Sequence, residues 1–238
     1  MNSEICSDVI IIGGGSCGAV LAARLSEDPA LQVCLLEAGG EDARWFVDAP
    51  LALSLTVPSR LFNWAFQTES QAGLAGRRGY QPRGKGLGGS SSINAQIYIR
   101  GHPMDYDHWA ELGNPGWSWA DVLPYFRRSE HNERFSDAFH GQGGPLHVAD
   151  IRSPNPFSRR MIEAAVAQGL PQIEDFSGAQ DEGVGWYQVT QKGGERWNVA
   201  RAYLGRPGEA GSARNRPNLR VITCLLYTSP SPRDRTRS

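Results

Sequence analysis

The sequence DVIIIGGGSCG at residues 8–18 determines how the chain begins to fold. Its first half is a short apolar run that is rich in β-branched residues and bounded by glycine, which predicts a strand buried on both faces in a parallel sheet. Its second half carries glycine at the first, third and sixth positions of a G-x-G-x-x-G turn. Apolar residues in 19–25 then predict a helix packed on that strand, and a second apolar run at 33–36 ends in Glu37. Together these segments predict a βαβ unit.

The residue types in this unit suit a dinucleotide. Gly13 permits the tight turn out of the strand, Gly15 lets the main chain approach a pyrophosphate, and Gly18 lets helix and strand pack closely. The phosphates would accept hydrogen bonds from free N–H groups at the helix N-terminus. Glu37, about 20 residues after the glycines, can accept hydrogen bonds from a ribose diol and would repel a 2′-phosphate, which disfavours NADP. These residues leave the choice between FAD and NAD open.

The length and composition of the chain limit the number of domains and the classes of partner that can be expected. A chain of 238 residues is long enough for one large domain or two small ones. Because 24 Lys and Arg balance 25 Asp and Glu, the charge gives no indication of nucleic acid or an anionic membrane as partner. The cysteines have neither metal-ligand nor disulfide-framework spacing and are expected to be reduced and structural: Cys6, Cys17, Cys34 and Cys224. No apolar run is long enough to span a bilayer, so no integral membrane segment is expected.

A second informative stretch is GKGLGGSSSIN at residues 84–94. Its glycines and serines predict a flexible loop whose main-chain N–H groups can surround an anion, although an ordinary surface turn is an equally common interpretation. A serine hydrolase is disfavoured, because the order is G-G-S-S rather than G-x-S-x-G and no strand leads directly into it. Trp64 lies in a predicted short strand at 63–68, either beside a flavin or in the core.

Together, residues 8–37 and 84–94, with the sequence continuing through Asp107, resemble the glucose-methanol-choline (GMC) oxidoreductases, most closely the choline dehydrogenase and alcohol dehydrogenase branch. The resemblance covers about residues 8–224. It implies FAD as the cofactor. It also implies an α/β fold, in which a Rossmann-like FAD-binding domain with a βαβ start is followed by the beginning of an α+β substrate-binding domain, truncated within this chain.

By this resemblance the chain divides into four parts: the first part of the FAD-binding domain at 1–145, the start of the substrate-binding domain at 146–192, a return to the FAD-binding domain at 193–224, and a tail at 225–238. The tail is polar, basic and interrupted by proline. It is interpreted as adapter read-through, with a disordered native tail as the alternative.

The family's FAD contacts map onto ten positions of this sequence, with the main chain of Val221 beside the adenine as an eleventh: Gly13, Gly15, Ser16, Gly18, Glu37, Ala38, Ser90, Asn94, Ala95 and Ile97. Some relatives attach FAD covalently through a histidine next to the motif asparagine. This chain has Ile93 there, so non-covalent binding is expected.

The implied function is oxidation of a choline-like or other primary alcohol to the aldehyde by hydride transfer to flavin. The reduced flavin would pass electrons to a quinone, another acceptor or O₂. The family's catalytic histidine would lie beyond residue 238, so no catalytic base is assigned. The alternatives are an FAD-containing cyanohydrin lyase, an inactive FAD-binding fragment, and an NAD enzyme that leaves 84–94 unexplained. The protein is expected in the cytoplasm. An alternative is peripheral attachment to the inner membrane through its electron acceptor.

Further expectations concern the second half of the chain. A capping box at Ser118 predicts a helix running towards Ser129, and Pro124 argues against its continuity. Another helix is predicted at 157–168, with strands at 146–148 and 183–191. The family resemblance implies a further strand at 218–223. Charged residues in 127–134 are interpreted as a solvated face, and Trp109, Trp117 and Trp119 as core. The histidines are expected in surface or loop positions, and none is assigned a role: His102, His108, His131, His140 and His147.

Overall fold

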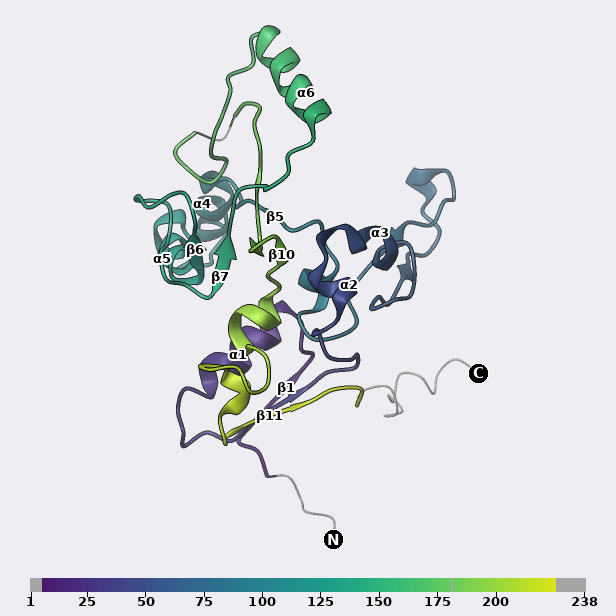
Figure 1. Cartoon of the computed structure of the whole chain (residues 1–238), viewed down its shortest axis with the longest axis vertical. Coiled ribbons are helices and arrows are strands. Elements are labelled where there is room, and N and C mark those ends of the chain that lie inside the picture. The colour runs from purple at the N-terminus through teal and green to yellow at the C-terminus, as the bar shows by residue number, and fades with distance from the viewer. Residues whose placement is uncertain (1–5, 181, 226–238) are drawn as a thin grey trace. The chain divides into compact units, whose positions relative to one another are not determined.

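The computed structural model describes residues 6–180 and 182–225 (Figure 1). The described chain divides into two compact units, the first formed by the residues up to 95 with those from 198 onward, and the second by 96–197. The boundaries predicted at 145/146 and 192/193 separate an FAD-binding domain from a substrate-binding domain. The division into compact units does not test these roles, so both boundaries stay predictions. Most of the predicted tail lies outside the described residues. Within those residues, no helix combines the length and apolar character needed to cross a bilayer.

The first unit is built on a parallel sheet of three strands in the order β1-β2-β11: β1 (Val9–Ile12), β2 (Val33–Leu36) and β11 (Leu219–Ile222). Helix α1 (Ser16–Leu25) connects β1 to β2. The predicted βαβ unit and the predicted returning strand are therefore confirmed, and both outer strands pair with β2 in matching register.

The core of this unit lies between α1 and the sheet. Small side chains on α1, among them Ala19 and Ala22, pack with Leu35 of β2 and Leu204 of the returning segment. At Gly18 a β-carbon would lie 1.9 Å from the carbonyl oxygen of Gly13, so only glycine allows the helix to come this close to the strand end. Figure 1 shows α1 alongside the sheet.

The expectation that β1 is buried on both faces is wrong for the described residues. Ile11 faces α1 and is buried, whereas Ile10 and Ile12 are 60% and 74% exposed. Successive side chains of a strand point to opposite faces of a sheet. Since α1 covers only one face, the other two isoleucines have nothing packed over them within the described chain.

The remaining elements of the first unit are short. They comprise two α-helical turns, one antiparallel strand pair, four 3₁₀ turns and one π-helical segment: α2 (Trp45–Asp48), α3 (Leu53–Thr56), β3 (Phe66–Gln67) with β4 (Tyr80–Gln81), η1 (Pro50–Ala52), η2 (Ala72–Leu74), η3 (Gly89–Ser92), η5 (Ala213–Asn215) and η4 (Ala200–Leu204). The short strand expected at 63–68 is thus confirmed over two residues.

The second unit contains three helices and three pairs of short strands: α4 (Pro103–Glu111), α5 (Trp119–Ser129), α6 (Pro156–Ala167), β5 (Ile97–Tyr98) with β8 (Gln188–Val189), β6 (Glu130–Asn132) with β7 (Leu146–Val148), and β9 (Gln191–Lys192) with β10 (Glu195–Arg196).

The predicted capping box is confirmed, since the Ser118 hydroxyl accepts from the N–H of Asp121 and the Asp121 carboxylate accepts from the N–H of Ser118. Helix α5 runs to Ser129 and continues through Pro124, so the predicted helix is confirmed without a break. Helix α6 begins one residue before its predicted start, after Asn155 as the capping residue.

Candidate functional site

The two glycine-rich segments singled out in the sequence lie against each other in the first unit. The N–H of Gly88 donates to the carbonyl oxygen of Gly14 at 2.8 Å. A β-carbon on Gly89 would lie 2.8 Å from the Cα of Gly15, closer than any side chain can be accommodated. Gly88 and Gly89 both have positive φ, at 83° and 54°, which glycine adopts without strain.

The same loop continues alongside the end of β2. A β-carbon on Gly39 would lie 2.2 Å from the carbonyl oxygen of Lys85, and the N–H of Leu87 donates to the carbonyl oxygen of Gly40 at 3.0 Å. Residues 84–89 therefore run along the carboxyl ends of both β1 and β2. In an open parallel α/β sheet this edge is where ligands bind.

The N-terminus of α1 opens beside this loop. Its capping residue, Gly15, has extended backbone and provides no side-chain cap, and the first helical residues Ser16 and Cys17 are exposed. The helix dipole and the first N–H groups favour an anion at such an end. The first turn of α1 carries no acidic residue that would oppose a phosphate.

Glu37 holds together the turn that follows β1 and the turn that follows β2. Its carboxylate accepts from the N–H of Gly14 and from the N–H of Gly39, both at 2.7 Å, and the residue is buried. A carboxylate has about four lone-pair sites, so two remain for a ribose hydroxyl. Sequence reasoning assigned Glu37 only to the ribose, and that role stays a prediction.

Two buried polar residues support the serine loop and were not singled out from the sequence. The side-chain amide of Asn198 donates to Ser92 Oγ at 2.9 Å and to the Asp42 carboxylate at 3.2 Å. Burial raises the pKa of Asp42, and the hydrogen bond from Asn198 opposes this shift only in part. The N–H of Val199 also donates to Ser91 Oγ at 3.0 Å. No local pattern reveals these contacts, because the partners are distant in sequence.

Two ion pairs fix the returning segment beside the end of β2. Arg214 donates to both carboxylate oxygens of Glu41, at 2.6 and 3.0 Å, and Arg206 lies 2.5 Å from Asp48. Both arginines are partly buried, and each forms its ion pair with one of these acids.

The structure places the remaining predicted contacts as follows. Ser90 and Asn94 are exposed next to the glycines, and the main-chain N–H of Asn94 donates to the carbonyl oxygen of Ser90 at 2.9 Å. Ala38 is buried behind Glu37, and Ala95 is exposed. In β11, Val221 pairs with Leu35 of β2. Ile97 belongs to the second unit, so its role towards the cofactor stays a prediction.

Trp64 lies at the surface rather than in the core, with 37% of its area exposed. Its ring stacks on Phe66 at a centroid distance of 5.7 Å and an angle of 6° between planes. The Lys85 ammonium lies 4.5 Å from the centre of the same ring. The Trp64 ring therefore contacts side chains of the first unit. Stacking of this ring beside a flavin stays a prediction.

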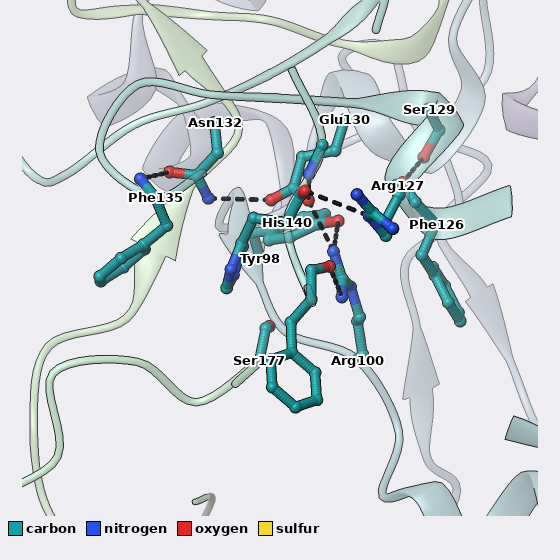
Figure 2. A network of polar contacts seen from close by, with 12 residues as sticks. Tyr98, Arg100, Phe126, Arg127, Ser129, Glu130, Asn132, Phe135, His140 and Ser177 are labelled. Atoms are coloured by element: carbon teal, nitrogen blue, oxygen red, sulfur yellow. Dashed lines mark hydrogen bonds and ion pairs between the residues drawn. The ribbon is translucent and has the colours of Figure 1, made fainter. Parts of the chain in front are cut away.

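A separate polar cluster occupies the interior of the second unit (Figure 2). Arg100 and Glu130 form an ion pair at 2.6 Å with both side chains buried, and the Asn132 amide donates to Glu130 at 2.8 Å. His140 is also buried. The expected solvated face at 127–134 is confirmed for Arg127, Arg128, Glu133 and Arg134 and is wrong for Glu130, which is buried. His140 lies in a loop, as expected, but it is buried rather than at the surface.

The expected tryptophan core and structural cysteines are also partly wrong. Trp109 and Trp117 are 46% and 52% exposed. Among the cysteines only Cys34 is buried, and all four are free thiols. Within residues 6–180 and 182–225, no three His, Cys, Asp or Glu side chains are arranged to hold a metal ion.

Comparison with known proteins gives consistent matches. A family model described as GMC oxidoreductase matches residues 7–229. An alcohol dehydrogenase (acceptor) of Pseudomonas putida is 48% identical over 217 residues, covering 91% of this chain and 38% of the relative. An oxygen-dependent choline dehydrogenase of Sinorhizobium medicae is 44% identical over 219 residues, covering 92% and 39%. The chain thus spans less than two fifths of the length of these relatives.

Solved structures agree in fold. The crystal structure of pyridoxine 4-oxidase from Mesorbium loti matches with a TM-score of 0.84 and 37% identity, over 92% of this chain and 42% of that one. An FAD-dependent oxidoreductase from Chaetomium thermophilum matches with a TM-score of 0.81 and 32% identity, over 91% and 38%.

Proposed function

The chain belongs to the GMC oxidoreductase family, and from that premise we propose that its first unit binds FAD as the nucleotide-binding part of an enzyme that oxidises an alcohol. The observation that carries this proposal is the contact between residues 13–18 and 84–94. One glycine segment alone is a weak indication of a nucleotide site. Two such segments, joined by the Gly88 to Gly14 hydrogen bond, form one backbone-lined cradle.

The residues of the cradle fit the ADP end of the cofactor. The open N-terminus of α1 at Ser16, with Ser90 of the adjoining turn, would hold the pyrophosphate. Glu37 would accept hydrogen bonds from the ribose diol, and the main chain of Val221 would lie beside the adenine. The contacts to the pyrophosphate and flavin would come from Ser90, Asn94, Ala95 and Ile97, with Trp64 nearby.

FAD, when bound, supplies the acceptor for the hydride that leaves the alcohol carbon. The residues of the cradle bind and orient it, and none of them is proposed as the catalytic base. The names of the relatives, alcohol dehydrogenase and choline dehydrogenase, support a small-molecule alcohol as substrate. We extend the proposal to a quinone, another acceptor or O₂ as the electron acceptor, and to a protein that spans no membrane.

Gly15 offers a sharp test, because its backbone and surroundings tolerate a methyl group. Its φ and ψ lie in an ordinary region, and a β-carbon would meet only the Cα of Gly89 at 3.9 Å. For Gly15→Ala we expect the free energy of unfolding to stay within about 0.5 kcal/mol of the parent chain. The affinity for FAD should fall roughly tenfold or more, because the methyl group would occupy the path of the pyrophosphate.

The measurement is titration of FAD into the chain, followed by quenching of flavin fluorescence. Gly73→Ala is the matched control, because a β-carbon there meets nothing within 4 Å and its φ is not positive. It should leave FAD affinity unchanged. A folded parent chain that binds no FAD, or a Gly15→Ala variant that binds as tightly as the control, contradicts the proposal.

A further inference from the structure

His140 lies between two carboxylates inside the second unit. Its side chain has no exposed surface, and it follows strand β6 in the loop that leads to β7. Nδ1 is 2.9 Å from Asp137 Oδ1 in the same loop. Nε2 is 3.5 Å from Asp175 Oδ1, which belongs to the segment 173–178. This is an ion-pair distance, and Nε2 makes no hydrogen bond there. The ring therefore connects two loops that are distant in sequence.

Both carboxylates are fixed by their own loops. Asp137 Oδ1 accepts from the N–H of Phe139 at 2.8 Å, and Asp175 Oδ1 accepts from the N–H of Ser177 at 2.8 Å. A β-carbon on Gly178 would lie 2.3 Å from the second oxygen of Asp175, so the loop closes tightly around this carboxylate. Each acid thus has a main-chain donor in its own loop in addition to its contact with the imidazole.

The protonation state of the ring decides whether both contacts are attractive. A neutral imidazole carries a proton on one nitrogen and a lone pair on the other. Whichever tautomer forms, one carboxylate then faces a lone pair in a buried position. Only the imidazolium is attracted to Asp137 and to Asp175 together, through the hydrogen bond at Nδ1 and the ion-pair contact at Nε2.

The charges around the ring agree with this. Burial lowers the pKa of His140, but the interactions with Asp175 and Asp137 outweigh burial, the charge of Glu130 adds to them, and the pKa lies above its ordinary 6.5. The nearby cations are engaged elsewhere. Arg100 is paired with Glu130, and Arg127 donates to the carbonyl oxygen of His140 at 3.3 Å.

The last three residues of this segment, 176–178, line a cavity of about 210 Å³ in this unit. Phe176, Ser177 and Gly178 line one side of it, and Arg100 and Trp119 are among the residues of the other side. Because Asp175 immediately precedes this wall, any change in its contact with His140 acts on the wall directly.

We propose that protonated His140 is a latch that holds the loop at 137–140 to the segment 173–178, and that loss of its proton releases the Phe176–Gly178 wall of the cavity. The latch needs both a charged ring and charged acids. It is strongest between the ordinary pKa values of aspartate, 3.8, and histidine, 6.5.

The direction of the pH dependence follows from linkage. Since folding raises the pKa of His140, its contribution is complete below 6.5 and is lost as the pH rises through the raised value. Since interaction with His140 lowers the pKa of Asp137 and of Asp175, even though desolvation opposes this, their contribution is lost only as the pH falls through those lowered values. Neutral to alkaline conditions therefore open the latch.

The test is amide hydrogen exchange of segment 173–178 in the whole chain, corrected for the intrinsic pH dependence of exchange. Between about pH 6 and pH 9 the protection of this segment should fall roughly tenfold in the parent chain. In His140→Gln the protection should be low and independent of pH. His108→Gln, which changes a largely exposed histidine, should keep the parent profile.

Parent protection that does not depend on pH, or a His140→Gln variant that retains the parent profile, overturns the proposal. Should His140→Gln not fold, the ring is titrated in the parent chain by nuclear magnetic resonance. The Ser177 amide signal should then shift with the same midpoint as the His140 ring nitrogens. A ring that is neutral at about pH 6 also overturns it.

Discussion

Gly89 and Gly15 approach so closely that a β-carbon on Gly89 would lie 2.8 Å from the Cα of Gly15. Each glycine belongs to a separate motif, one at the βα turn of the sheet and the other in the loop at 84–94. The contact joins the motifs into one surface of main-chain donors at the carboxyl edge of β1 and β2. Both ends of this surface depend on glycine, which explains why the two sequences are rich in it.

Gly89→Ala should destabilise the first unit. The residue has a φ of 54°, where a side chain costs roughly 1–2 kcal/mol, and overpacking adds roughly 1–3 kcal/mol. We expect the free energy of unfolding to fall by about 2–5 kcal/mol in denaturant titration. Gly73→Ala should cost less than about 0.5 kcal/mol. Equal stability of the two variants would show that the loops are not in contact.

Glu37→Ala should loosen the cradle more than Glu37→Gln. Alanine leaves the buried N–H groups of Gly14 and Gly39 without their acceptor, at roughly 1–3 kcal/mol each. Glutamine keeps one acceptor oxygen and should lose about half as much. Thermal unfolding of the three chains measures this order. A Glu37→Ala variant as stable as the parent would mean that the carboxylate does not hold the turns.

Asp42→Asn should flatten the acid side of the stability profile. Because burial raises the pKa of Asp42 above 3.8, the folded chain binds this proton more tightly than the unfolded chain. Its contribution to stability is complete below 3.8 and declines as the pH rises through the raised value. The free energy of unfolding, measured against pH, should show this decline in the parent and not in the variant. Glu69→Gln, at a highly exposed acid, should leave the decline in place.

The Arg100–Glu130 pair should show strong coupling. Removing one partner leaves a buried charge, at about 3–5 kcal/mol for Arg100→Met or for Glu130→Leu. The double variant should cost clearly less than the sum of the two, because it buries no unpaired charge. A double-mutant cycle in denaturant measures the difference. Additive costs would mean that the two side chains do not interact in solution.

Local patterns predicted the local structure well. Periodicity and glycine placement predicted β1, α1 and β2, and the Ser118 capping box predicted the start of α5, because each depends on neighbouring residues. The strand β11 was predicted from the family resemblance. Burial was predicted less well. A charged residue in a sequence is expected in water, and only the fold reveals that Glu130 meets Arg100.

The candidate site was predictable in part for the same reason. Its glycines and Glu37 follow known motif spacing, whereas the support that Asn198 gives to Ser92 and Asp42 depends on a returning segment far along the chain. Ile10 and Ile12 are exposed because nothing in the described part of the chain packs over their face of the sheet. The sequence of a strand does not show which elements pack on its two faces.

Hydrogen exchange with and without FAD tests most directly whether a single nucleotide contacts both glycine segments. We expect the amides of residues 13–18 and of residues 84–94 to gain protection together, with the same half-saturating FAD concentration. Protection of one segment alone, or half-saturation at different FAD concentrations for the two, would contradict a shared site.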